Sequence, residues 1–215
     1  MKVLSVAVGR PRPIEWRGQV AESAIHKAPV AGRVAVRRLN LDGDQQADLS
    51  VHGGAEKAVY VYPSEHYPLW RQELPDADLA WGAFGENLTT EGLSEGAVHV
   101  GDRLRIGTAE FVVTQPRMPC YKLGMRFRRA DMVKRFLRSG RTGFYLAVVK
   151  EGALGAGDPI AREPAAGDAI TIAEVASLYT ADADNRELLR RAVQTAALPQ
   201  GWRDHFQRRL WDADT

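Results

Sequence analysis

Residues 103–120 read RLRIGTAEFVVTQPRMPC, two short apolar runs followed by the only cysteine of the chain. The runs, at residues 103–106 and 110–114, are separated by a glycine and have the length and composition of strands closed by a turn. Comparable runs, punctuated by Gly, Pro, Asn and Asp, continue to about Thr171. Many short strands of this kind predict a mainly β fold with a barrel rather than a wound α/β sheet.

The remaining strands are predicted at residues 2–8, 18–24, 33–36, 58–62 and 144–150. Two helices should interrupt them, one at residues 64–73 with Ser64 as its N-cap and one at residues 131–139. The first part of the chain is therefore expected to form a β-barrel with short helices.

The character of the sequence changes near Gly167, after which apolar residues follow helical spacing. Thr171 and Glu174 have the spacing of a capping box, which marks the start of a helix. We expect a barrel domain at residues 1–171 and a small three-helix C-terminal domain at residues 172–215. Because short helices are marginal in isolation, this tail should pack on the barrel, on a second subunit or on a partner.

The single cysteine excludes several kinds of site. One thiol forms neither an internal disulfide nor a cage of several thiolates for zinc or an iron–sulfur cluster. The apolar run at residues 2–8 is too short to cross a membrane and stops at Gly9 and Pro11 without a cleavage site. The sequence therefore predicts a cytoplasmic protein with no membrane segment.

Positive charge gathers in one part of the chain, although the net charge is only +2. Residues 116–141 hold nine Lys or Arg residues against one acidic residue, Asp131. The aromatic residues of this stretch are not interleaved as a stacking platform, so we expect no nucleic acid. An anionic small ligand or an acidic protein partner suits this charge better.

Cys120 is the leading candidate for chemistry. Pro116 and Pro119 stiffen the approach to it, and Arg117 and Lys122 flank it with positive charge. Positive neighbours favour the thiolate, which is the form that binds metals and acts as a nucleophile. A lone cysteine is also commonly a small buried hydrophobic residue, and the sequence leaves that alternative open.

Two other segments hold polar candidates. His52 precedes Gly53 and Gly54, so it can lie close to a ligand or donate a proton near neutral pH, or it can merely hydrogen-bond a loop carbonyl. Lys27 stands just before a proline turn, where a lysine usually faces solvent.

The loop at residues 81–89 has closely spaced glycines around Glu86 and Asn87. Its backbone N–H groups can bind an anion, as irregular nests do, or the two polar side chains can cap a hairpin turn. The spacing of a P-loop is absent from this loop, so nucleotide hydrolysis is not expected.

Taken together, these segments resemble the MOSC domain family, the molybdenum-cofactor sulfurase C-terminal domains, over roughly residues 20–165. The matching pieces, in the family's order, are Lys27-Ala28-Pro29-Val30, residues 48–54, Phe84-Gly85-Glu86-Asn87-Leu88, Gly101-Asp102-Arg103 and Gln115-Pro116-Arg117-Met118-Pro119-Cys120. The helical tail is similar to that of the stand-alone bacterial YiiM-type branch, which is linked to resistance against N-hydroxylated purines.

The resemblance implies a MOSC-type β-barrel that binds the molybdenum cofactor, with Cys120 as the metal ligand. It also implies that Lys27 and His52 lie nearby as catalytic proton donors. Arg117 is expected at the anionic end of the molybdopterin. The other expected cofactor-binding residues are Phe84, Gly85, Glu86 and Asn87.

The reaction implied is the reduction of an N-hydroxylated small molecule, of the hydroxylaminopurine or amidoxime type. Because the chain has neither the cysteines of an iron–sulfur cluster nor a GxGxxG turn, electrons should come from a ferredoxin, a flavodoxin or a flavoprotein reductase. Residues 126–141 are the expected docking surface for that donor, and a homodimer is possible.

Other functions use the same residues. Cys120 can carry a persulfide in a sulfur-carrier or cofactor-handling protein. A cysteine hydrolase would use Cys120 and His52, with Asn87 or Asp48 orienting the histidine. The helical tail leaves a pure interaction module as a further alternative.

Overall fold

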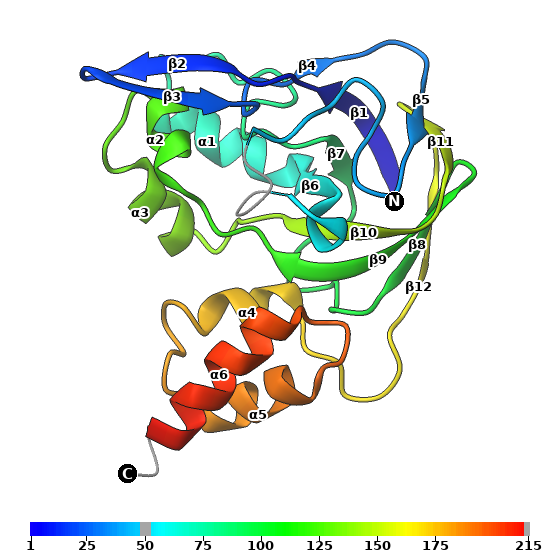
Figure 1. Cartoon of the computed structure of the whole chain (residues 1–215), viewed down its shortest axis with the longest axis vertical. Helices are drawn as coiled ribbons and strands as arrows, with labels where there is room; N and C mark the ends of the chain where they lie inside the picture. Colours follow the sequence, from blue (N-terminus) through cyan, green and yellow to red (C-terminus); the bar gives the residue numbers. More distant parts are fainter. Residues whose placement is uncertain (48–52, 213–215) are drawn as a thin grey trace.

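The computed structural model of the chain describes residues 1–47 and 53–212. Within these residues, strands form one sheet of eight and two sheets of two (Figure 1). The large sheet has the order β12-β8-β9-β10-β6-β7-β1-β4. Its strands are β1 (Lys2–Val8), β4 (Ala28–Pro29), β6 (Val59–Pro63), β7 (Leu88–Glu91), β8 (Arg103–Ile106), β9 (Ala109–Pro116), β10 (Phe144–Lys150) and β12 (Ile160–Glu163). The small sheets pair β2 (Arg12–Trp16) with β3 (Gln19–Ser23), and β5 (Arg33–Val36) with β11 (Gly152–Gly155).

The large sheet is strongly curled. Its neighbours are antiparallel except for β6 and β7, which are parallel. Val3 of β1 donates to the carbonyl of Asp158 at 3.0 Å and accepts from the amide of Gly157 at 2.8 Å, so the chain just before β12 lies against β1. The mainly β class is confirmed, although the ladder of the described strands does not run on into a closed barrel.

Strand β6 separates two hydrophobic clusters, because successive side chains of a strand point to opposite faces. Val59 and Val61 belong to the core inside the curled sheet. Tyr60 and Tyr62 belong to the second cluster, which lies under the helices that cover the other face. All five residues of β6 are therefore buried, and the strand is continuously apolar or aromatic.

Short helices cover the second cluster. They are η2 (Ser64–His66), α1 (Tyr67–Glu73), α2 (Tyr121–Phe127) and α3 (Met132–Arg138). A further turn, η1 (Ala55–Lys57), lies against β9 and β10. The predictions of helix at 64–73 and 131–139 are confirmed, but Ser64 is not the N-cap of the α-helix. A 3-10 turn comes first, and the Ser64 hydroxyl points instead to the carboxylate of Glu65 at 3.4 Å.

Helix α2 was not predicted. It begins directly after Cys120 and buries Leu123, Gly124 and Met125 against the second cluster. The sequence signal is weak, because the helix has seven residues and its apolar side chains are mixed with Lys122, Gly124 and Arg126.

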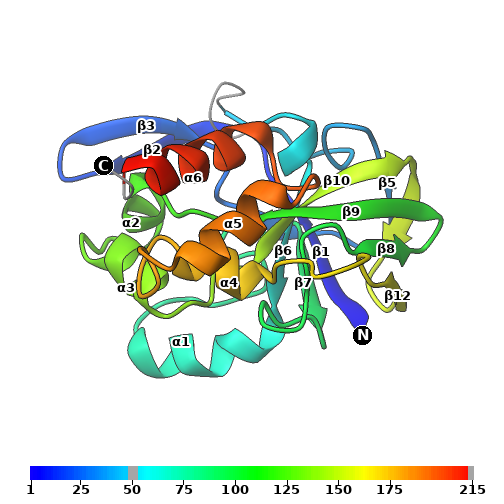
Figure 2. The same ribbon diagram turned by 90° about the horizontal axis from the view of Figure 1, so that it is seen from below.

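The C-terminal part of the described chain folds into α4 (Ile172–Ser177), α5 (Arg186–Gln194) and α6 (Gln200–Asp212). The capping box of Thr171 and Glu174 is confirmed at the start of α4. These helices lie over β9 and β10 (Figure 2), and Ile172, Val175 and Phe206 belong to the same hydrophobic cluster as the sheet interior. The tail therefore packs on the β domain of its own chain.

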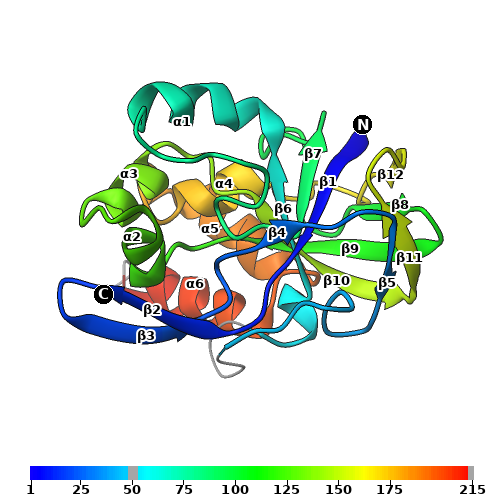
Figure 3. The same ribbon diagram turned by 90° about the horizontal axis from the view of Figure 1, so that it is seen from above.

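The β2–β3 hairpin projects beside α2 (Figure 3). Its two-residue turn consists of Arg17 and Gly18, both with positive φ, at 52° and 73°. That geometry matches the twist of the flanking strands. The sequence predicts β3, as residues 18–24, but not β2. The turn is not evident from the sequence, because Arg-Gly lacks the Asn-Gly or Asp-Gly signal of such turns.

None of the helices in the described ranges is both long enough and apolar enough to cross a membrane.

Candidate active site

A cavity of about 100 Å³ lies where several strands end beside the start of α2. Its wall includes six residues with polar side chains, which come from five segments of the chain: Lys27, Asp44, Lys57, Asn87, and the neighbouring Arg117 and Cys120. Gly85, Lys122, Tyr60 and Tyr145 also line it. The structure thus brings together five of the residues predicted from the sequence, namely Lys27, Gly85, Asn87, Arg117 and Cys120.

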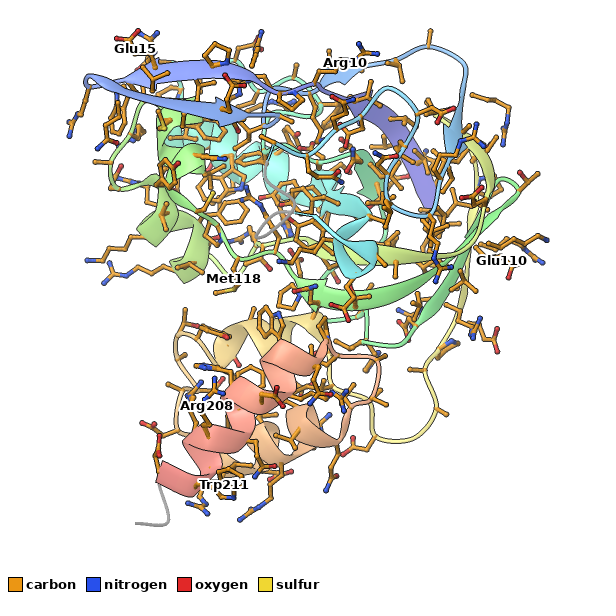
Figure 4. The ribbon with its side chains drawn as sticks, in the orientation of Figure 1. Arg10, Glu15, Glu110, Met118, Arg208 and Trp211 are labelled. Carbon is orange, nitrogen blue, oxygen red and sulfur yellow. The ribbon has the colours of Figure 1, made fainter. Side chains whose placement is uncertain are left out.

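Cys120 occupies the N-cap position of α2 with an extended backbone, φ −115° and ψ 174°. Strand β9 ends at Pro116, so Arg117, Met118 and Pro119 form the link between strand and helix. The side chain of Cys120 is half-buried, and its carbonyl accepts the first bond of the helix from Leu123 at 2.9 Å. The neighbouring Met118 lies on the side that faces the helical domain (Figure 4).

Lys27 and Asp44 form a buried ion pair in the wall of the cavity. Their side chains are 8% and 2% exposed, and the Lys27 ammonium donates to Oδ1 of Asp44. Burial lowers the pKa of Lys27, while Asp44 and, more weakly, Glu86 oppose the decrease. Lys27 is therefore a better proton donor than an exposed lysine, and Asp44 fixes its position.

The other contacts of Asp44 extend this polar network. Its Oδ1 also accepts from the amide of Gly9 at 2.8 Å, and its Oδ2 accepts from Nδ2 of Asn87 at 2.9 Å. Oδ1 of Asn87 accepts from the amide of Tyr60 at 3.0 Å. Asn87 thus has both ends of its amide engaged, and it joins β6 to the carboxylate that holds Lys27.

Arg117 is only 7% exposed, with its guanidinium 5.2 Å from the ring centre of Tyr60 and 5.3 Å from that of Phe136. Tyr60 and Tyr145 are register partners on β6 and β10, and their rings are 5.3 Å apart. Burial raises the pKa of Tyr145, although Arg117 opposes the shift. Nη1 of Arg117 is buried and makes no hydrogen bond to any described residue.

The cavity is cationic. Lys57 and Lys122 add to Lys27 and Arg117, whereas Asp44 is the acidic residue among the described wall residues. Burial lowers the pKa of Lys57, partly offset by Glu56. Because Asp44 forms an ion pair with Lys27, the positive charges of Lys57, Arg117 and Lys122 are not balanced by it and suit an anionic ligand.

Phe84 and Glu86 do not line the cavity. Phe84 is fully buried and stacks on Tyr62 at 4.7 Å. The Glu86 carboxylate accepts from the amides of Gly82 at 2.8 Å and Phe84 at 3.1 Å, and from the hydroxyl of Thr89 at 3.0 Å. The amides of this loop therefore bind its own Glu86, as in the turn alternative considered above.

Gly85 reaches the cavity wall because it has no side chain. Its φ is +83°, and a Cβ there would lie 2.9 Å from the side chain of Ile25. His52, the second predicted proton donor, and Asp48 lie outside the described residues, so the pairing of Lys27 with His52 remains a prediction.

Sequence reasoning missed Asp44, Lys57, Tyr60 and Tyr145. Asp44 lies in the segment Leu41-Asp42-Gly43-Asp44, which reads as an ordinary turn. The tyrosines could have been found from the alternation of Val and Tyr in β6, which puts both of its tyrosines on the face opposite the valine core.

The chain thus combines a mainly β domain, which has Cys120 at a cationic cavity, with three helices that follow it. The chain belongs to the MOSC domain family, whose sequence profile matches residues 48–161. Residues 170–211 match the YiiM-like, 3-alpha helix domain. MOSC domains are associated with binding of the molybdenum cofactor.

Two bacterial proteins are similar in sequence to most or nearly all of this chain. YflK of Bacillus subtilis is 40% identical over 96% of this chain and 93% of its own length, and YiiM of Escherichia coli is 36% identical over 88% and 90%. A crystal structure of YiiM from Geobacillus stearothermophilus superposes with a TM-score of 0.81 at 33% identity, covering 97% of this chain and 98% of that one. A protein named reductase from Gibberella moniliformis is 40% identical over 74% of this chain, which is 28% of its own length. The family and the reductase relative together indicate an enzyme.

Proposed function

We propose that this protein is a molybdenum-cofactor-dependent reductase of N-hydroxylated compounds, of the hydroxylaminopurine or amidoxime type. The observation that carries the proposal is the meeting at one cavity of Cys120 and Arg117, which share the link between β9 and α2, with Lys27, which lies 90 residues before Arg117 in the sequence. Membership of the MOSC family and the reductase relative support an oxidoreductase of this kind.

The residues of the cavity fit the cofactor. Cys120 offers a thiolate, the soft ligand that suits a molybdenum already held by the sulfurs of its pterin. Nη1 of Arg117 is a buried donor without a partner among the described residues, and such a donor costs about 1–3 kcal/mol unless an acceptor satisfies it. An anionic oxygen would accept from Nη1, so we assign Arg117 to the anionic end of the cofactor. We assign Cys120 to the metal because of its thiolate.

Lys27 is assigned the proton transfer. When bound, the cofactor would supply the two-electron chemistry of the reduction. Overall, R–NHOH, two electrons and two protons give R–NH2 and water. The lowered pKa of Lys27 favours release of a proton to the leaving oxygen, which leaves a neutral amine, and Asp44 holds the Lys27 side chain in place while it is protonated again from solvent. His52 is the proposed second donor.

The electrons come from a separate protein, a ferredoxin, a flavodoxin or a flavoprotein reductase. We place its docking surface on α2 and α3, where Arg128, Lys134 and Arg138 are exposed. Two other arginines of the basic stretch are paired within the chain: Arg129 with Asp131 at 3.2 Å, and Arg135 with Asp131 at 2.6 Å. The exposed three are left to attract an acidic partner.

The hydrolase alternative is less well supported by the geometry. It needs Asn87 or Asp48 to orient His52, and both ends of the Asn87 amide are already engaged by Tyr60 and Asp44. The sulfur-carrier alternative shares Cys120 with the reductase, so only the contents of the purified protein separate the two.

The test measures molybdenum and pterin in the protein made by a host that synthesises the cofactor. We expect near-stoichiometric molybdenum in the wild type, retention in Trp211→Phe and a loss of more than tenfold in Cys120→Ala, because the thiolate is the proposed ligand. Equal molybdenum in the wild type and Cys120→Ala would contradict the assignment. A labile persulfide without molybdenum would favour the sulfur carrier.

Turnover is tested on the same preparations, with hydroxylaminopurine or an amidoxime and a reduced viologen dye as the electron source. Lys27→Met should retain molybdenum while its kcat falls by about 10²–10⁴, the usual contribution of a positioned proton donor. Full turnover by this variant would remove Lys27 from the mechanism.

A further inference from the structure

An indole of the helical domain forms a hydrogen bond with β9, the strand that leads to the cavity. Nε1 of Trp202, near the start of α6, donates to Oε1 of Gln115 at 2.7 Å. The Trp202 ring is held in place by Tyr179, at 5.2 Å between ring centres, and by Phe206, at 5.8 Å. Gln115 belongs to β9 and is 2% exposed. A side chain from one domain therefore satisfies a buried polar group in the other.

The other end of the Gln115 side-chain amide is hydrogen-bonded to the turn η1. Its Nε2 donates to the carbonyl of Glu56 at 3.4 Å, and the neighbouring Thr114 hydroxyl donates to the same carbonyl at 2.7 Å. Glu56 precedes Lys57, which lines the cavity. The bond from Trp202 fixes which end of the Gln115 amide faces the turn, because the indole N–H can only donate.

Gln115 also has cavity residues on two other sides. It is the register partner of Tyr145 across the β9–β10 ladder, and Arg117 lies two residues further along the chain. Tyr145 and Arg117 both line the cavity, as does Cys120 beyond them. A change in the orientation of the Gln115 amide would therefore shift several residues of the cavity wall.

We propose that Trp202 is a positioning residue for the Cys120 cavity, acting through Gln115 on the turn that carries Lys57. The three-helix domain is then a part of the active-site scaffold. This role goes beyond the proposed reaction, and it concerns the shape of the cavity whichever cofactor or substrate the cavity holds.

The experiment uses the full chain from a host without the molybdenum cofactor, so that the rate of alkylation of Cys120 by iodoacetamide reports on the cavity. Trp202→Phe keeps a ring in place and removes the N–H. We expect alkylation to become about three- to tenfold faster, the effect of losing one hydrogen bond on a local opening equilibrium. Trp211→Phe is the matched control, because Trp211 is 62% exposed at the far end of α6 (Figure 4), and it should change the rate less than twofold.

A second variant distinguishes positioning from a general loss of stability. Gln115→Met removes the bond from Trp202 and also the bond to Glu56, so it should accelerate alkylation at least as much as Trp202→Phe does. The double variant should be no faster than Gln115→Met alone, because the bond that Trp202→Phe removes is already absent from it. The indole N–H signal of Trp202 in an NMR spectrum should move in Gln115→Met, while those of the other tryptophans stay in place.

An unchanged alkylation rate in Trp202→Phe would overturn the proposal, as would a double variant whose effects add. Urea unfolding of each variant shows that it is folded, and if Gln115→Met does not fold, Trp202→Phe against Trp211→Phe decides the matter. Neither metal content nor turnover enters these measurements, so their outcome is independent of the proposed function.

Discussion

At the scale of single residues, Asp44 holds the polar wall of the cavity together. Replacing it by Asn leaves the Lys27 ammonium buried without its countercharge, and breaking a buried pair in this way costs about 3–5 kcal/mol of unfolding free energy. We expect this loss for Asp44→Asn in urea unfolding. Asp42→Asn, two residues away, breaks the exposed pair with Arg37 and should hardly move the midpoint. Equal losses in the two variants would contradict the buried-pair assignment.

His26 is expected to make stability depend on pH. Burial and the nearby charges of Arg126 and Arg12 lower its pKa from 6.5 to about 4. Between these values the unfolded chain binds a proton that the folded chain does not, so this part of the stability is lost as pH falls from about 6.5 to 4. His26→Gln should flatten that part of the pH profile, measured by urea unfolding at several pH values. An unaltered slope would show that His26 titrates normally.

The sequence identifies the residues of the site that stand out locally and misses those that depend on a distant contact. Cys120 and Arg117 are visible because prolines and positive charges surround them. Asp44 is invisible in the sequence, because its importance comes from a side chain 17 residues away and from Asn87, 43 residues away. Phe84 and Glu86 share a motif with Asn87, yet they face the aromatic cluster and the loop's own amides.

At the scale of elements, α2 and α3 carry the proposed docking surface. Reversing two exposed charges, with Lys134→Glu and Arg138→Glu together, should slow reduction by an acidic protein donor at least tenfold at low salt, because attraction of opposite charges steers the encounter. Turnover with the small viologen dye should stay the same. Raising the salt concentration should shrink the difference between the variant and the wild type.

The matched control for this surface lies on the sheet. Arg103 and Arg105 are exposed on β8, so replacing both by Glu makes the same change in net charge. This control should reduce the rate with the protein donor much less. Equal slowing by the two double variants would show that net charge matters and that the location of the charges on α2 and α3 does not.

Elements were predictable where the pattern of burial is regular. Strand β8 reads RLRI and alternates exposed and buried residues, so its bounds were predicted as they are. Strands β4, β11 and β12 are short and sit at sheet edges, and β4 has two exposed residues. With so little alternation to read, such strands are defined by the backbone that pairs with them rather than by their own sequence.

At the scale of the whole molecule, the helical domain shares one hydrophobic cluster with the sheet. Phe206 of α6 is fully buried in it, so Phe206→Ala should cost about 3–5 kcal/mol. Because the cluster is continuous, the loss should appear in the unfolding of both domains, followed by tryptophan fluorescence and by far-UV circular dichroism. Two separate transitions, with only the helical one shifted, would show that the domains unfold independently. Trp211→Ala, at an exposed position, should change little.

The path of β1 has a consequence for the order of folding during synthesis. This first strand pairs with β7, more than 80 residues later, and its Val3 bonds to Gly157 and Asp158. At about 5–20 residues per second, a ribosome completes β7 roughly 4–17 s, and Asp158 roughly 8–30 s, after it has made β1. Apart from its short pairing with β4, the apolar strand must wait for these partners, and such long-range pairings fold slowly. We therefore expect newly made chains to need protection from aggregation until the last strands and the helical tail emerge together.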